Sequence, residues 1–161
     1  MQLKTSNKVS ENSKNASQKI SLAQRRRARR LVLQALYQWL MADAPPREIA
    51  EQFHEQNKGK IDWEYFDDVF VNISSQKESL NLYLQPVLDR KLDALDAIER
   101  ALLYIGVFEL ANRVDIPYKV VINECIELAK LFGAADSHKY VNGVLDKLVS
   151  TLRAVESGAR T

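Results

Sequence analysis

From Arg25 onward, apolar residues recur along the chain at steps of three and four, the spacing of one buried face of an α-helix. The first such run covers residues 25–42 and ends at the sequence DAPP. A short second helix is expected to begin near Pro46, because proline is tolerated in the first turn of a helix. Asp62 is placed to cap a third helix, whose apolar positions extend to Ile73.

The second half of the chain continues the helical pattern and contains no strand-like alternation. Three further helices are expected over residues 77–88, 92–113 and 118–132. Pro86 should kink or end the first of these, and Gly133 should cap the third. A last helix is expected to begin at Asp136 or Ser137. The pattern therefore predicts an all-α fold with about seven helices.

The N-terminal segment differs from the rest in composition. Residues 1–24 are rich in Ser, Asn, Lys and Gln, contain no aromatic residue and show little periodicity. Such a segment buries too little apolar surface to offset its ordering entropy, so we expect a flexible basic arm. The globular part is then expected over residues 25–155.

Charge is distributed unevenly along the 161 residues, although the net charge is only +2. Residues 1–30 contain nine Lys and Arg against one acid, a net charge of +8. Residues 31–161 contain fourteen basic and twenty acidic residues, a net charge of −6. The two parts can therefore contact partners of opposite charge. No apolar run is long enough to cross a bilayer, and no secretory signal precedes the helices. The single cysteine excludes an internal disulfide. We therefore expect a soluble, cytoplasmic protein without membrane contact.

Catalytic and metal-binding patterns are not found in the sequence. His54 and His138 have no second histidine or cysteine at the spacing of metal ligands. The residues of the DSH sequence at 136–138 point about 100° apart on a helix and cannot relay a proton among themselves. Cys125 belongs to an amphipathic helix and is expected in the core, and no glycine-rich phosphate loop is present. We therefore expect a binding protein without cofactor or metal, and not an enzyme.

The sequence QRRRARRLVLQALYQW at residues 24–39 contains five arginines in six positions. On a helix, one face within about 80° would carry four polar or aromatic residues, namely Arg26, Arg30, Gln34 and Tyr37. Arg27 borders this face on one side, and Arg25 and Arg29 flank its other edge. Arginine binds phosphates and stacks on bases, and an exposed tyrosine can stack on a base, so this face predicts binding of nucleic acid, with single-stranded RNA favoured over duplex DNA. A solvated charged face and a membrane-surface helix are the alternatives.

Three segments together resemble the NusB family of bacterial transcription antitermination factors: RRRARRLVLQALYQW, IERALLYIGVFEL and IPYKVVINECIELAKLFGAADSHKYVNGVLDK. The resemblance covers residues 25 to about 153. It implies two packed helical bundles, here about residues 25–88 and 92–155. It also implies binding to the boxA RNA of ribosomal RNA operon leaders, jointly with the small-subunit ribosomal protein NusE. Other Nus factors and RNA polymerase would complete the antitermination assembly.

The same resemblance implies roles for individual residues. The arginine motif matches at Arg25, Arg26, Arg27 and Arg29, and Arg30 makes the helix more cationic than in relatives that carry an acid there. Tyr37 matches a tyrosine on the same RNA-binding surface. The last helix would contact RNA through Asp136, Lys139 and Tyr140, the last of which is often Phe in the family. Glu99 matches an acidic position on the side that binds the partner protein.

Two other interpretations remain open at the level of sequence. NusB-like domains also form the N-terminal part of certain ribosomal RNA cytosine methyltransferases, although this chain contains neither a glycine-rich cofactor motif nor a Pro-Cys nucleophile. A structural helical bundle with a merely solubilising arginine face is the second. The sequence also leaves open whether the free protein is a monomer or a homodimer that covers the arginine face.

Overall fold

The computed structural model describes the backbone of residues 3–158 and the side chains of residues 22–158, and over this part of the chain the fold is all-α. The elements in chain order are α1 (Leu3–Ala42), α2 (Pro46–Gln56), α3 (Trp63–Ser75), α4 (Lys77–Leu84), η1 (Gln85–Val87), η2 (Leu92–Ala94), α5 (Ala97–Asn112), α6 (Tyr118–Phe132), α7 (Ser137–Leu152) and α8 (Ala154–Ser157), where η denotes a 3-10 helix. None of the described helices is both long and apolar enough to span a membrane.

Several helix ends lie where the sequence predicts them. Asp62 caps α3, because its carboxylate accepts a hydrogen bond from the backbone N–H of Tyr65. α1 ends before Asp43, whose positive φ of 51° is a backbone conformation that Asp tolerates better than most residues. Pro46 occupies the first turn of α2, and Gly133 follows the last residue of α6.

Other helix ends differ from the prediction. α5 begins at Ala97 rather than at residue 92, because the Asp96 carboxylate accepts a hydrogen bond from the backbone N–H of Glu99 and so caps the helix there. α4 ends at Leu84 rather than at residue 88; Pro86 ends it as predicted, and lies in the 3-10 turn η1 that follows. Asp136 precedes α7 but makes no capping hydrogen bond with its side chain. The short helix α8 was not expected.

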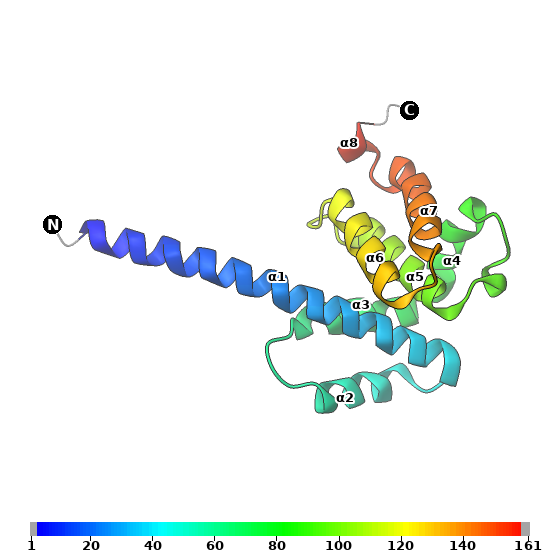
Figure 1. The fold of residues 1–161 in the computed structure, drawn as a ribbon, viewed down its shortest axis with the longest axis horizontal. Coiled ribbons are helices and arrows are strands. Elements are labelled where there is room, and N and C mark those ends of the chain that lie inside the picture. The colour runs from blue at the N-terminus through cyan, green and yellow to red at the C-terminus, as the bar shows by residue number, and fades with distance from the viewer. Residues whose placement is uncertain (1–2, 159–161) are drawn as a thin grey trace.

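The N-terminal segment forms the first part of α1. This helix begins at Leu3 and continues without a break into the arginine sequence (Figure 1). The flexibility expected for the basic arm over residues 1–24 stays a prediction. No glycine or proline precedes Pro45, so nothing in the sequence stops a helix that starts in the packed part from propagating towards the N-terminus. Propagation adds one hydrogen bond per residue and avoids the cost of a new nucleus.

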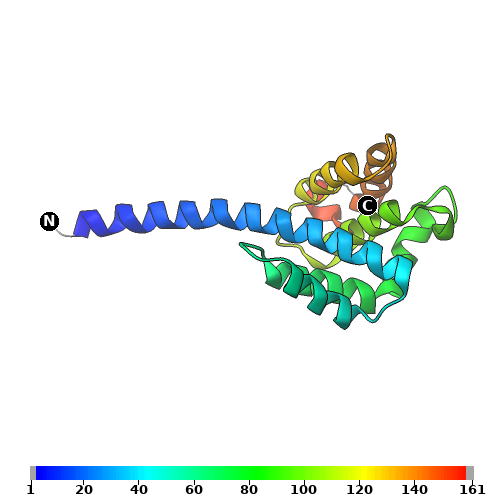
Figure 2. The ribbon, with the colours of Figure 1, turned by 60° about the horizontal axis from the view of Figure 1, so that its bottom comes forward.

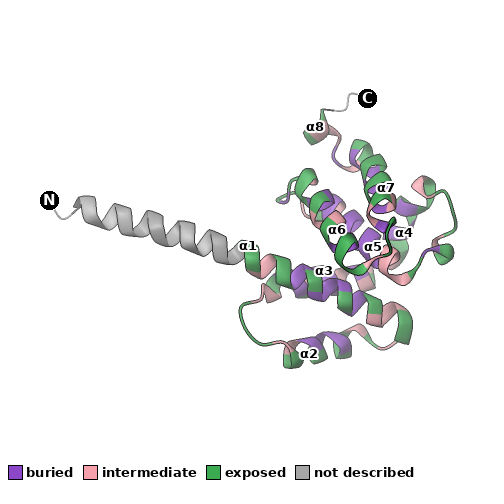
Figure 3. Cartoon of the chain, viewed as in Figure 1, coloured by how far each residue is buried: buried purple, intermediate pink, exposed green. Residues whose placement is uncertain are grey.

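Helix α1 lies between two groups of helices, with α2 and α3 on one side and α5 on the other (Figures 1 and 2). α5 is the central helix: all ten residues from 101 to 110 are buried, and α1, α3, α4, α6 and α7 all pack against it (Figure 3). α7 approaches α5 so closely at Gly106 that a Cβ atom there would lie 2.5 Å from Cδ2 of Leu145. The contacts of α1 with α2, α3 and α5 determine which of its faces is covered.

Candidate nucleic-acid interface

Arg29 does not face solvent, which corrects the prediction from the helical wheel. Its side chain is 3% exposed and forms a two-pronged ion pair with the fully buried Glu109 of α5. Nη2 donates to Oε1 of Glu109 at 2.9 Å, and Nε donates to Oε2 at 3.2 Å and to the Tyr65 hydroxyl at 3.1 Å. Arg29 lies four residues before Leu33 and seven before Leu36, both of which are buried. It therefore continues a buried stripe of α1 that packs against α5.

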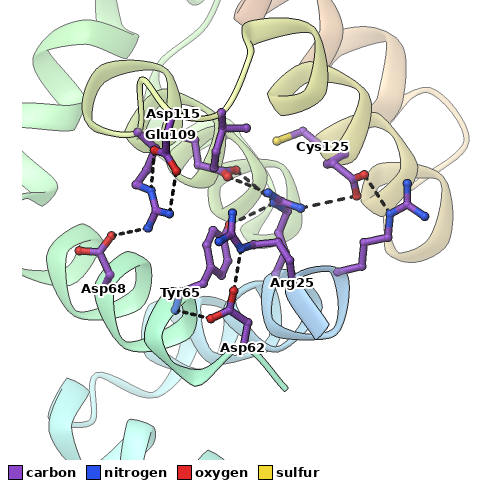
Figure 4. A network of polar contacts seen from close by, with 12 residues as sticks. Arg25, Asp62, Tyr65, Asp68, Glu109, Asp115 and Cys125 are labelled. Carbon is purple, nitrogen blue, oxygen red and sulfur yellow. Dashed lines mark hydrogen bonds and ion pairs between the residues drawn. The ribbon is translucent and has the colours of Figure 1, made fainter. Parts of the chain in front are cut away.

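A polar network surrounds this buried pair and joins α1 to three other helices (Figure 4). On the α3 side, Arg25 donates to Asp62 at 2.9 Å, and its guanidinium lies 5.0 Å from the ring centroid of Tyr65. Burial raises the pKa of Tyr65 well above the usual value, so the hydroxyl stays protonated. At the C-terminal end of α5, Arg113 pairs with both Asp68 and Asp115. The network holds the buried side of α1 in one orientation.

The five arginines therefore divide into different environments. Arg29 is buried and Arg25 is half-buried in its pair with Asp62. Arg27 is exposed and donates to the backbone carbonyl of Lys60 at 3.3 Å. Arg26 has a 65% exposed side chain, and Arg30 is exposed and forms no hydrogen bond or ion pair with any side chain that the structure describes. Guanidinium groups available to a ligand are thus concentrated at Arg26 and Arg30.

Tyr37 lies on the same exposed face of α1, as the helical wheel predicts, and is 41% exposed. It lines a hollow of about 370 Å³ together with Met41 and with Phe132 and Ala134 from the end of α6 and the following loop. Phe132 is itself 38% exposed, although its position in the helical pattern indicated a core residue. Two aromatic side chains are therefore open to solvent beside the arginines, and only the fold reveals the second.

A second hollow, of about 320 Å³, lies between α1 and α6. Its lining comes from Arg26, Arg29 and Arg30 of α1 and from Glu124, Glu127, Leu128 and Leu131 of α6. Leu131 is 69% exposed. The exposed face of α1 and the C-terminal half of α6 thus form a surface of cationic, acidic, aliphatic and aromatic groups. We call this surface the α1–α6 face.

The predicted residues of the last helix lie next to this face but differ in exposure. Asp136 and Lys139 are highly exposed at the start of α7. They form an ion pair in which Nζ of Lys139 lies 3.8 Å from Oδ1 of Asp136. Tyr140 is half-buried: its hydroxyl donates to Asp89 at 3.1 Å, and the Arg90 guanidinium lies 4.6 Å from its ring centroid. One face of the Tyr140 ring is therefore already in contact with a cation.

Glu99, the predicted partner-binding residue, is half-buried in the first turn of α5. It accepts a hydrogen bond from the hydroxyl of Ser137 at 3.1 Å, and burial raises the pKa of its carboxyl group.

Cys125 is fully buried in the core, as expected, and its burial raises the pKa of the thiol. Among the described residues, no three His, Cys, Asp or Glu side chains are grouped so that they could hold a metal ion.

Comparison with known proteins identifies the family of this fold. A model of the NusB family matches residues 26–150. The chain belongs to the NusB family. The transcription antitermination protein NusB of Alcanivorax borkumensis is 53% identical over 137 residues, which is 84% of this chain and 91% of that protein. NusB of Paraburkholderia phymatum is 49% identical over 136 residues, covering 84% and 94% of the two chains.

Solved structures of the NusB family have the same fold. T. maritima NusB superimposes with a TM-score of 0.68 at 28% identity, covering 78% of this chain and 89% of that chain. A chain from the crystal structure of the antitermination factors NusB and NusE in complex with dsRNA gives a TM-score of 0.71 at 26% identity, covering 78% and 96%. Both sequence relatives are transcription antitermination proteins.

The burial of Arg29 predicts a large difference between two neighbouring arginines. Arg29→Ala would leave the Glu109 carboxylate buried without its cation, so we expect the free energy of unfolding to fall by about 3–5 kcal/mol. Arg30→Ala removes an exposed side chain with no ion pair among the described residues, and the expected change is within about 0.5 kcal/mol. Urea denaturation followed by circular dichroism measures both. Equal, small effects of the two substitutions would show that the buried pair does not stabilise the fold.

Proposed function

We propose that this NusB-family protein binds single-stranded boxA RNA of ribosomal RNA operon leaders through the α1–α6 face and acts together with NusE. The observation that carries this proposal is the position of Arg26, Arg30 and Tyr37, which lie exposed on one face of α1 and outside the buried Arg29 pair. The guanidinium groups can bind phosphates, and the ring can stack on a base. One helix therefore carries both the guanidinium groups for phosphate binding and the ring for base stacking.

The choice of a single strand rests on the aromatic groups. Tyr37 and Phe132 line one hollow and are both partly open to solvent. Stacking on such side chains requires bases that are free of a duplex. The related solved complex contains NusB, NusE and dsRNA, which supports an RNA partner for this fold. We propose that this chain prefers unpaired boxA RNA.

The remaining predicted RNA contacts are proposed at the edges of this face. Arg25 and Arg27 lie about three helical turns before Tyr37 and would contact the RNA backbone. At the start of α7, Asp136, Lys139 and Tyr140 would contact RNA that continues past the loop after Gly133. Arg29 is excluded from these contacts, since its side chain is 3% exposed. We assign it the role of holding α1 in place.

The protein partner is proposed from charge. Residues 31–161 have a net charge of −6, and a ribosomal protein such as NusE is basic. Opposite charges on two surfaces increase the association rate and orient the encounter, and Glu99 would contribute on this side. We propose that the pair assembles in the cytoplasm with other Nus factors on RNA polymerase.

Selective binding of boxA RNA is the central prediction of this proposal. In fluorescence anisotropy titrations, a labelled single-stranded boxA RNA should bind more tightly than a scrambled strand of the same composition and than a boxA duplex. Addition of NusE should tighten the boxA complex. Equal and weak binding to all three RNAs, with and without NusE, would contradict the proposal and support a structural role for the bundle.

Removal of the exposed arginines should weaken binding in a salt-dependent way. For Arg26→Ala and Arg30→Ala, the slope of log K against log salt concentration should become shallower by about 0.7 for each phosphate of a single strand that the variant no longer binds. Arg47→Ala is the matched control, because Arg47 is exposed on α2, away from the α1–α6 face. The prediction fails if Arg47→Ala changes the slope as much as the two α1 variants.

Stacking on Tyr37 makes a separate prediction. Tyr37→Ala should weaken RNA binding by about 1–3 kcal/mol, whereas Tyr37→Phe, which keeps the ring, should have a smaller effect. Tyr83→Ala is the control, since Tyr83 of α4 is 42% exposed, close to the 41% of Tyr37. Equal losses for the Phe and Ala variants of Tyr37 would indicate that its hydroxyl, and not its ring, contacts the RNA.

A further inference from the structure

Glu124 of α6 contacts two arginines of α1 that differ in burial. Its Oε1 accepts a hydrogen bond from Nε of Arg26 at 3.0 Å, and its Oε2 lies 3.6 Å from Nη1 of the buried Arg29. Arg29 is itself fixed by Glu109 and the Tyr65 hydroxyl. The Glu124 side chain, which is 17% exposed, is therefore held from its buried side and presents its other oxygen at the surface.

Arg26 meets this carboxylate with only one of its nitrogens. Nε is hydrogen-bonded to Glu124, while the two terminal nitrogens Nη1 and Nη2 have no hydrogen-bond partner among the described residues. The side chain as a whole is 65% exposed. Two parallel N–H groups on one guanidinium edge can bind two oxygens of a phosphate at once. The edge formed by Nη1 and Nη2 is therefore free for an RNA phosphate while Nε remains bound.

We propose that Glu124 is a positioning residue for RNA binding, which orders the Arg26 guanidinium over α6 with its terminal nitrogens free to bind a phosphate. The proposal rests on the RNA-binding function proposed above. A long exposed side chain loses rotational freedom when it binds a ligand, and this loss typically reduces affinity by about two- to tenfold per side chain. Because Glu124 already forms an ion pair with the buried Arg29, it can order Arg26 before RNA arrives and remove part of that loss.

The direction in which RNA affinity changes when Glu124 is removed distinguishes a positioning role from a simple charge effect. Removal of an acid from an RNA-binding surface should by itself increase affinity, because phosphates are repelled by its charge. If Glu124 positions Arg26, Glu124→Ala should instead weaken RNA binding. Glu127, one turn further along α6, provides the control for charge: its side chain is 68% exposed, and among the described side chains it pairs only with Lys130 of the same helix, at 3.6 Å.

The experiment is a double-mutant cycle on boxA RNA affinity, measured by anisotropy with the full-length protein. We expect Glu124→Ala to weaken binding by about two- to tenfold and Glu127→Ala not to weaken it. In a protein that already carries Arg26→Ala, Glu124→Ala should have no further effect. Glu124→Gln, which keeps an acceptor oxygen at the same reach, should restore binding to at least the wild-type level. Thermal denaturation of each variant verifies that the fold persists.

Unchanged or tighter binding by Glu124→Ala would overturn the proposal, as would an equal loss in the Arg26→Ala background. If Arg26→Ala weakens binding while Glu124→Ala does not, only the positioning role fails and the proposed RNA-binding function stands. A measurement without RNA gives an independent test. The ¹⁵N heteronuclear NOE of Arg26 Nε–Hε should indicate an ordered group in the wild type and a mobile one in Glu124→Ala. A mobile Arg26 Nε in the free wild-type protein would also overturn the proposal.

Discussion

The ion pair between Arg29 and Glu109 is the interaction on which the arrangement of α1 depends. Both side chains are almost completely buried, and a buried charge is tolerated only where a partner and further hydrogen bonds replace its hydration. Here the guanidinium has two hydrogen bonds to the carboxylate and one to the Tyr65 hydroxyl. Because this pair holds the Arg29 side of α1 against α5, it also helps to determine which residues of α1 reach solvent.

Because of the buried pair, the arginines of one short sequence have two different roles, one in stability and one at the surface. Arg29 stabilises the packing of α1 on α5, and Arg26 and Arg30 remain on the surface beside Tyr37. Glu124 connects the two groups, because it contacts Arg29 on its buried side and Arg26 on its exposed side. A structural ion-pair network and a ligand-binding surface thus share the same helix, which explains why five arginines in six positions do not all behave as surface charges.

Most of the fold could be predicted from the sequence, because the helix boundaries are set by local signals. Asp62 caps α3 and Pro46 begins α2 through contacts with residues only a few positions away. The burial of Arg29 depends on Glu109, eighty positions later, which periodicity within α1 cannot detect. The acid in the apolar sequence IGVFEL is a signal that a buried partner is needed. The exposure of Phe132 likewise results from how α6 ends beside α1, and not from its helical pattern.

The most direct test of this account is the NMR signal of each arginine Nε–H in ¹⁵N-labelled protein during titration with boxA RNA. Arg29 should give a slowly exchanging signal in the free protein, and RNA should not shift it. The signals of Arg26 and Arg30 should shift on binding. A shift of Arg29 as large as theirs, or rapid exchange of Arg29 with solvent, would contradict the division between one structural arginine and the RNA-binding arginines beside it.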